Sequence, residues 1–190
     1  MKSEPFFHGW RLTAARVLAL LVVIAIMVLA FVYRDVASQL GTYGYIGIFL
    51  LSIIANATII IPVPGIAITF TMGAVFNPIG VALAAGAGAA LGELTGYLMG
   101  FSGQGVIDDN PTFQRLVGWM ERFGAWVVVT LAIIPNPLFD LAGMAAGALR
   151  MPIAKFLLWA WIGKTIKMLL FAYAGATSVG WMMSLFGGIP

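Results

Sequence analysis

Four ionisable side chains fall inside long apolar stretches. Glu93 lies in GAALGELTGYLMG, Asp140 in IIPNPLFDLAG, and Lys164 and Lys167 in WIGKTIKM. A charged side chain at the centre of a bilayer costs roughly 2.5–3.5 kcal/mol on insertion scales and marks a transport path or a charge pair by default. The two acids and two bases are therefore candidates for carrying a polar group through an apolar medium. The alternative is a structural ion pair between Glu93 and one of the two lysines.

A second candidate site surrounds Asn136, which stands between Pro135 and Pro137, four residues before Asp140. Proline removes a backbone donor and breaks a helix. Asparagine is a favoured N-cap and proline a favoured first helical residue, so a short helix is predicted to begin near Asn136. Its free N–H groups would offer partial positive charge to an anion, with Asp140 on the same face. The alternative is a purely structural hairpin tip.

The composition of the chain predicts the kind of secondary structure in which these residues lie. The chain has 190 residues, of which 62% are hydrophobic and 9% charged, against about 25% charged in ordinary soluble domains. No Asp, Glu, Lys or Arg occurs between residues 36 and 92. These features predict an all-α polytopic membrane protein.

Several function classes are disfavoured by the same composition. The 10 Lys and Arg residues are scattered, which argues against nucleic-acid binding, and cysteine is absent. The lone His8 lies in the polar N-terminus, so we expect no metal site. Neither a nucleophile–base set nor a phosphate loop stands out, so we expect a non-enzyme without cofactor, with proton coupling as the open question.

Helix breakers and charges divide the chain. We expect a cytoplasmic segment with a first transmembrane helix over 1–35, a domain over 41–176 and an apolar tail over 177–190. The domain is expected to contain a first hairpin 45–76, a helix 79–101, a loop 102–122, a second hairpin 123–150 and a helix 153–176. The loop is expected to contain a short helix near 114–121. The first arm, 45–61, could instead span the membrane.

The two hairpins match each other in layout. IIPVPGIAITFTMGAVFNP and IIPNPLFDLAGMAAGALRMP each contain a P-x-P turn, a short arm of small residues and an exit proline. Pro62 and Pro64 form the first turn, and the second follows 73 residues later at Pro135. The match predicts two re-entrant hairpins in an inverted repeat, each followed by a spanning helix. Carried onward at 74 residues, the repeat aligns Glu93 of the first long helix with Lys167 of the second.

Basic residues support this topology. An inverted repeat with a cytoplasmic N-terminus leaves only Arg34 outside and puts seven basic residues inside: Lys2, Arg11, Arg16, Arg115, Arg122, Arg150 and Lys155. Small residues recur at a spacing of four, which is typical of closely packed membrane helices: Gly80, Ala84, Gly88, Gly92, Gly96 and Gly100.

The motifs IPNPLFDLAGMAAGALRMP, WIGKTIKM and GELTGY resemble the vacuole membrane protein branch of the DedA superfamily, also called the VTT-domain or SNARE-associated Golgi protein superfamily. The resemblance covers roughly residues 43–176. It implies opposed re-entrant hairpins and a role in lipid handling, which is phospholipid scrambling in eukaryotic relatives. In bacterial relatives it implies polyprenyl-phosphate recycling or proton-linked transport.

This chain departs from the proton-linked pattern of acidic residues at the first turn and arginines at the second. The first turn offers only Asn56, and Leu138 and Phe139 occupy the second beside Asp140. We therefore expect an energy-independent phospholipid scramblase or flippase in a prokaryotic plasma membrane. The alternatives are a proton- or ion-coupled transporter of a small solute or polyprenyl-phosphate carrier, and a membrane scaffold that dimerises through the glycine series.

The expected partners are membrane phospholipids or a polyprenyl-phosphate lipid, and a second copy in a homodimer. The candidate path residues are Asn136, Asp140, Glu93, Lys167, Lys164, Asn56 and Arg150, with the turns at Pro62, Pro64, Pro135 and Pro137.

Overall fold

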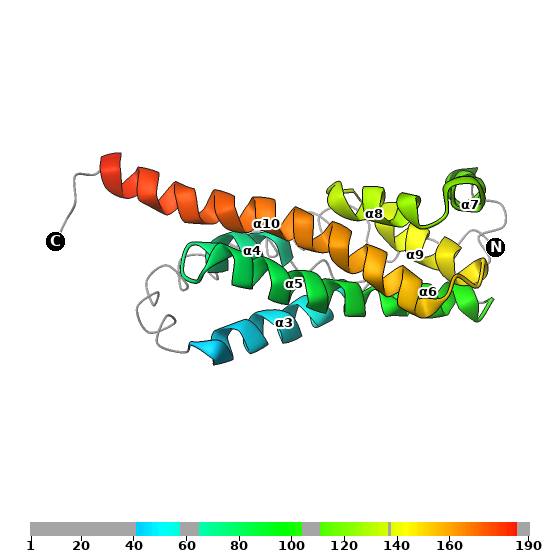
Figure 1. Cartoon of the computed structure of the whole chain (residues 1–190), viewed down its shortest axis with the longest axis horizontal. Helices are drawn as coiled ribbons and strands as arrows, with labels where there is room; N and C mark the ends of the chain where they lie inside the picture. Colours follow the sequence, from blue (N-terminus) through cyan, green and yellow to red (C-terminus); the bar gives the residue numbers. More distant parts are fainter. Residues whose placement is uncertain (1–40, 58–64, 104–110, 137, 186–190) are drawn as a thin grey trace, which may run out of the picture.

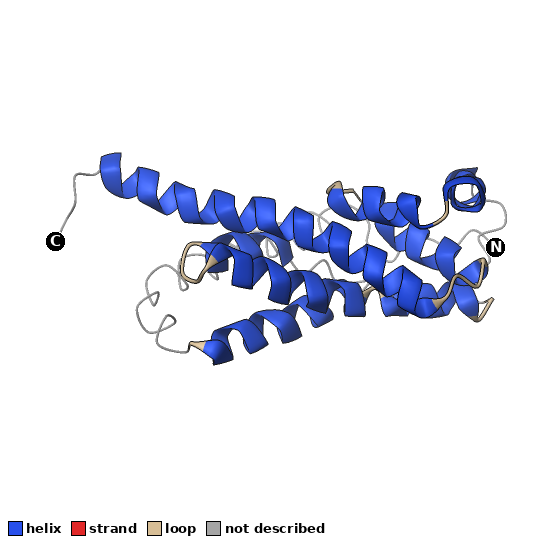
Figure 2. Cartoon of the chain, viewed as in Figure 1, coloured by secondary structure: helices blue, strands red, loops and turns tan. Residues whose placement is uncertain are grey.

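The structure is a computed structural model that describes residues 41–57, 65–103, 111–136 and 138–185. Over these residues the chain is all-helical and contains no strand (Figure 2). The expected first transmembrane helix, the turn at Pro62 and Pro64, and Pro137 lie outside the described residues. The helices are α3 (Thr42–Ala57), α4 (Gly65–Gly73), α5 (Pro78–Gly92), α6 (Leu94–Phe101), α7 (Pro111–Phe123), α8 (Ala125–Ile133), α9 (Leu138–Ala148) and α10 (Ile153–Leu185).

Two helical segments are long and apolar enough to cross a membrane. One is formed by α5 and α6 together, Pro78–Phe101, with 24 residues, and the other is Ile153–Ser178 of α10, with 26 residues. The predicted helices 79–101 and 153–176 are thus confirmed as helices. Helix α10 continues beyond the predicted end at residue 176 to Leu185, within the expected apolar tail. No proline interrupts that segment before Pro190, so the helix has no strong stop signal.

The residues predicted as hairpin arms are helical: α3 and α4 cover the first pair of arms, and α8 and α9 the second. In Figure 1, α3 and α4 lie beside α5, whereas α9 lies beside α6 and α8 along α10, toward the opposite end of the long helices. The 16 residues of α3 would rise about 24 Å, which is short of the roughly 30 Å of hydrocarbon in a bilayer. By length, the described part of this arm is not a full span.

Helix α4 packs on α10 through two glycines, one on each helix. A Cβ at Gly73 would overlap the carbonyl oxygen of Ala172, and a Cβ at Gly175 would overlap that of Phe70. Only glycine permits such close contact between backbones, so these positions fix the distance between the two helices.

The same arrangement recurs between α9 and α6. A Cβ at Gly147 would overlap the carbonyl oxygen of Tyr97, and a Cβ at Gly100 would overlap that of Met144. Gly147 follows Gly73 by 74 residues, and Gly100 precedes Gly175 by 75. The second arm of each hairpin therefore packs on the long helix that follows the other hairpin.

The first arms pack on the long helix of their own unit. Gly88 of α5 meets the carbonyl oxygen of Phe49 on α3, and Gly163 of α10 meets that of Val129 on α8. Ser52 adds a hydrogen bond from its hydroxyl to the carbonyl of Ala85, 2.6 Å long. Members of the predicted small-residue series thus contact helices of the same chain.

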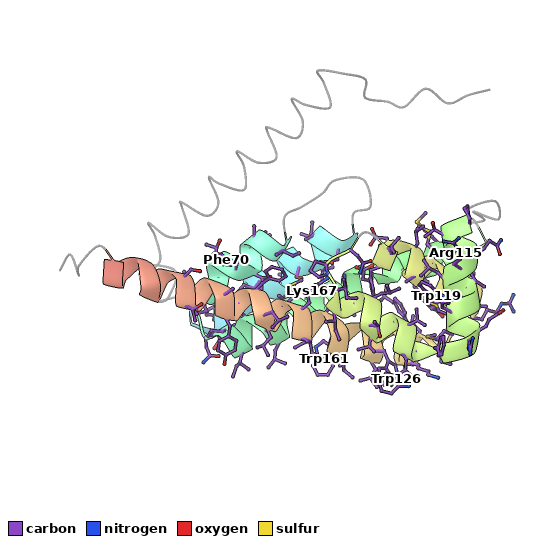
Figure 3. All side chains as sticks on the ribbon, turned by 90° about the horizontal axis from the view of Figure 1, so that it is seen from above. Phe70, Arg115, Trp119, Trp126, Trp161 and Lys167 are labelled. Carbon is purple, nitrogen blue, oxygen red and sulfur yellow. The ribbon has the colours of Figure 1, made fainter. Side chains whose placement is uncertain are left out.

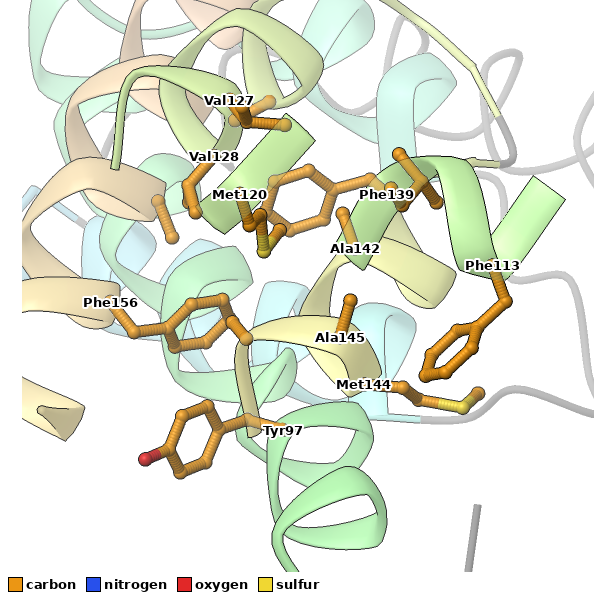
Figure 4. Close-up of a cluster of buried hydrophobic side chains, with 14 of the residues drawn as sticks. Tyr97, Phe113, Met120, Val127, Val128, Phe139, Ala142, Met144, Ala145 and Phe156 are labelled. Carbon is orange, nitrogen blue, oxygen red and sulfur yellow. The ribbon is translucent and has the colours of Figure 1, made fainter. Parts of the chain in front are cut away.

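Helix α7 corrects the prediction for residues 102–122. Most of that expected loop is a helix that begins at Pro111 and extends past the predicted 114–121. Phe113, Leu116 and Met120 are buried and belong to the cluster shown in Figure 4. Their spacing of three and four residues places them on one face, which the helix buries against α9.

A buried ion pair where the hairpins meet the long helices

Glu93 and Lys164 form an ion pair inside the protein. The Lys164 ammonium group donates a hydrogen bond to the Glu93 carboxylate, and both residues are at most 4% exposed. Glu93 sits at the junction of α5 and α6, near the middle of the first long segment. Lys164 lies near the middle of the second. The pair therefore links the two long segments far from their ends.

Both hairpins contribute to the surroundings of Lys164. Its ammonium group donates a second hydrogen bond, of 3.1 Å, to Oδ1 of Asn56 near the end of α3. It also lies 4.4 Å from the centroid of the Phe139 ring at the start of α9. A cation over an aromatic face is stabilised electrostatically. Lys164 is thus held by one residue from each hairpin as well as by Glu93.

Lys167 and Asp140 complete the charged group. Lys167 lies one turn after Lys164, is only 7% exposed and appears near the middle of the molecule in Figure 3. Asp140 is half-buried in the first turn of α9. Both are near enough to act electrostatically on Glu93. Two acids and two bases therefore share this region, which we call the charge cluster: Glu93, Asp140, Lys164 and Lys167.

The sequence predicted an ion pair between Glu93 and one of the two lysines, and the structure forms this pair with Lys164. The offset of 74 residues only aligns Glu93 with Lys167 as equivalent positions of the repeat. The long helices meet closely where Gly86 of α5 faces Thr165 of α10. The offset between the turns carries no information about which residue of α10 reaches Glu93.

Asn136 joins the two arms of the second hairpin. Its side-chain oxygen accepts a 2.8 Å hydrogen bond from the backbone N–H of Leu138, the first residue of α9. Its amide group donates to the carbonyls of Leu131 and Ile134 at the end of α8, at 3.1 and 2.8 Å. Asn136 thus caps the start of α9, as predicted, and also satisfies carbonyls of the preceding helix.

Arg150 is not brought to the charge cluster. It is exposed just beyond α9, about 15 Å along the helix from Asp140. Its φ of 52° and the hydrogen bonds Arg150 N–H to Gly147 and Met151 N–H to Ala146 form a Schellman motif. Arg150 therefore ends a helix at a position that usually carries glycine.

Sequence reasoning missed Phe139 as a contact of the buried lysine. Its position beside Asp140, two residues after Pro137, is a signal for the hairpin turn. Nothing in the sequence indicates which lysine would lie over its ring.

These features define a class: a helical membrane protein whose two hairpins and two long helices share a buried charge cluster. The family of this chain follows from a family-model match to the VTT domain over residues 61–177, more than half of the sequence. The chain belongs to the VTT domain family, which confirms the resemblance inferred from its motifs.

Two curated relatives come from Arabidopsis thaliana. Vacuole membrane protein KMS1 is 34% identical over 103 residues, which cover 43% of this chain and 25% of the relative. Vacuole membrane protein KMS2 is 34% identical over 100 residues, which cover 43% and 24%. The chain thus matches only about a quarter of the length of these relatives. No solved structure gives a significant match.

Proposed function

We propose that this protein is an energy-independent phospholipid scramblase, in which two re-entrant hairpins enter from opposite sides of the membrane. The observation that carries the proposal is the charge cluster, where Asn56 of the first hairpin and Phe139 of the second both contact Lys164. Polar groups at mid-membrane lower the barrier for a headgroup, because hydrocarbon offers no hydrogen-bond partner.

The reciprocal packing of the second arms supports opposed hairpins. The contact between Gly73 and Ala172 has its counterpart between Gly147 and Tyr97, with the two units exchanged. Such an exchange is expected of two units related by a two-fold axis in the membrane plane. The topology we propose has a cytoplasmic N-terminus in a prokaryotic plasma membrane.

The chemistry of the cluster supports passive movement of a zwitterionic or anionic headgroup. Its two acids and two bases balance each other. Lys164 already binds the Glu93 carboxylate, so it is not expected to bind a phosphate tightly. Lys167 forms no ion pair with a carboxylate among the described residues and could attract a phosphate transiently. Weak interactions of this kind permit both entry and release.

A coupled transporter is the second candidate, because Glu93 and Lys164 form a buried pair. A pair of this kind can exchange its partner for a proton or an ion during transport. The substrate of such a transporter would be a small solute or a polyprenyl-phosphate lipid.

The proposed topology predicts that the exits of the two hairpins lie on opposite sides of the membrane. Thr42, at the Asn77 end of the first hairpin, and Ala154, beside Arg150, are both exposed. With no native cysteine, Thr42→Cys and Ala154→Cys provide single labelling sites. In intact cells, an impermeant maleimide should label Thr42→Cys alone, and Ala154→Cys should react only after permeabilisation. Labelling of both cysteine variants from the same side of the membrane would contradict the inverted repeat.

The proposed path predicts that Asn136→Leu slows lipid movement. The substitution removes the cap of α9 and leaves the Leu131 and Ile134 carbonyls without the amide donor. Asp140→Asn should alter the rate or headgroup preference, because it removes one charge from the cluster. The measurement is lipid translocation in liposomes at matched protein content, with size-exclusion profiles for each variant.

Thr177→Ala is the matched control, since Thr177 is exposed near the far end of α10 and its hydroxyl bonds only to carbonyls of that helix. If well-folded Asn136→Leu and Asp140→Asn both translocate lipid like the parent, the turn is a structural tip and the path lies elsewhere.

A further inference from the structure

Helix α7 lies across the end of the long helices. It is seen end-on in Figure 1 and runs across the molecule in Figure 3, which is turned by 90°. A helix perpendicular to membrane-spanning helices lies in the plane of the membrane surface. Its buried face, which includes Leu116 and Met120, packs on the protein. Its other face is left for the lipid–water interface.

The exposed side of α7 carries a stripe of basic and aromatic residues. Arg115, Trp119 and Arg122 are spaced by four and three residues, so they share one face. Phe123 adjoins Trp119 on this side, and the two are 52% and 50% exposed. Tryptophan and arginine are favoured at membrane interfaces, where the aromatic ring meets acyl chains and the guanidinium meets headgroups.

A groove opens between α7 and α8 directly beside this stripe. It has a volume of about 360 Å³ and is lined by Trp119, Phe123, Trp126, Val127, Thr130 and Leu131. The lining is mostly apolar, and the hydroxyl of Thr130 within it donates to the carbonyl of Trp126, at 2.8 Å. An open apolar groove of this size suits part of an acyl chain.

Positive charge gathers at the rim of the groove. The Arg122 guanidinium lies 5.2 Å from the centroid of the Phe123 ring, which is itself part of the lining. At this end of the molecule, the exposed charged residues of α7, of the segment joining α9 to α10 and of the first turn of α10 are Arg115, Glu121, Arg122, Arg150 and Lys155. Among these described residues, one acid stands with four bases, which favours an anionic headgroup.

We propose that this groove binds one anionic glycerophospholipid, with an acyl chain against Trp119 and Trp126 and its phosphate near Arg122 and Arg115. The site is separate from the charge cluster and does not depend on lipid translocation. It would hold a lipid of the membrane leaflet that contacts α7.

The test is native mass spectrometry of the full chain, purified in detergent and incubated with phosphatidylglycerol or phosphatidylcholine. Thr130→Trp fills the groove, Arg122→Gln removes the rim charge, and Thr177→Trp is the control on exposed surface outside the groove. Melting temperatures show whether each variant is folded.

We expect the parent to retain phosphatidylglycerol in preference to phosphatidylcholine. Arg122→Gln should weaken phosphatidylglycerol binding about fivefold, the effect of one arginine near a lipid surface, and leave phosphatidylcholine binding unchanged. Thr130→Trp should reduce retention of both lipids, whereas Thr177→Trp should not.

Equal retention of the two lipids by the parent, or full retention by folded Thr130→Trp, would overturn the proposal. Translocation activity is measured separately, so loss of this site and failure of the scramblase proposal are distinguishable.

Discussion

Lys164→Met is expected to destabilise the protein by about 3–5 kcal/mol, the usual cost of removing one partner from a buried ion pair. The substitution leaves the Glu93 carboxylate buried without its lysine and removes the contacts to Asn56 and Phe139. Adding Glu93→Gln should recover part of this loss, because the double variant no longer buries an unpaired charge. The free energy of unfolding in mixed micelles gives the four values of a double-mutant cycle.

Lys167→Met is the matched control for this cycle. Lys167 has the same side chain and similar burial, three residues further along α10, but no carboxylate bonded to it among the described residues. We expect its substitution to cost less than that of Lys164 and to show weaker coupling to Glu93→Gln. Additive losses for Glu93 and Lys164, with a coupling energy below about 0.5 kcal/mol, would contradict the pair.

The second large effect is expected at the glycines between the hairpins and the long helices. Gly73→Ala and Gly147→Ala each place a methyl group onto a backbone carbonyl of the facing helix, and a backbone cannot move aside as a side chain can. Each should therefore cost at least about 1–3 kcal/mol, the range for overpacking a tight interface. Because the two contacts are equivalent in the two units, the losses should be similar. Thermal unfolding in detergent measures both.

Gly47→Ala and Gly118→Ala are matched controls within helices. A Cβ at either position meets no atom within 4 Å. These substitutions should be neutral or stabilise the helix by about 0.5–1 kcal/mol. If Gly73→Ala and Gly147→Ala melt like these controls, the helices are not held as closely as described.

Much of the fold could be predicted because its signals are local. The break at Pro135 and the cap at Asn136 are set by neighbouring residues, and the long helices by uninterrupted apolar sequence. The length of helix α7 was underestimated, because its charged residues suggested a loop. The spacing of Phe113, Leu116 and Met120 carried the helical signal and was readable.

The composition of the charge cluster could also be predicted, since ionisable residues are rare in this sequence. Which lysine pairs with Glu93 could not be predicted, because this pairing depends on the depth at which α5 and α10 cross. The close approach of Gly86 to Thr165 sets that depth, and neither residue is distinctive in sequence. The groove beside Trp126 likewise depends on the angle between α7 and α8.

The most direct test of the proposed function is transbilayer movement of fluorescent phospholipid in sealed liposomes that contain the purified protein and no ion gradient or nucleotide. An impermeant reductant bleaches reporters in the outer leaflet only. With a scramblase, reporters from the inner leaflet are bleached as well, and an imposed proton gradient or an uncoupler does not change the rate. Bleaching that stops at the outer leaflet, as in protein-free liposomes, or movement that requires the proton gradient, would contradict energy-independent scrambling.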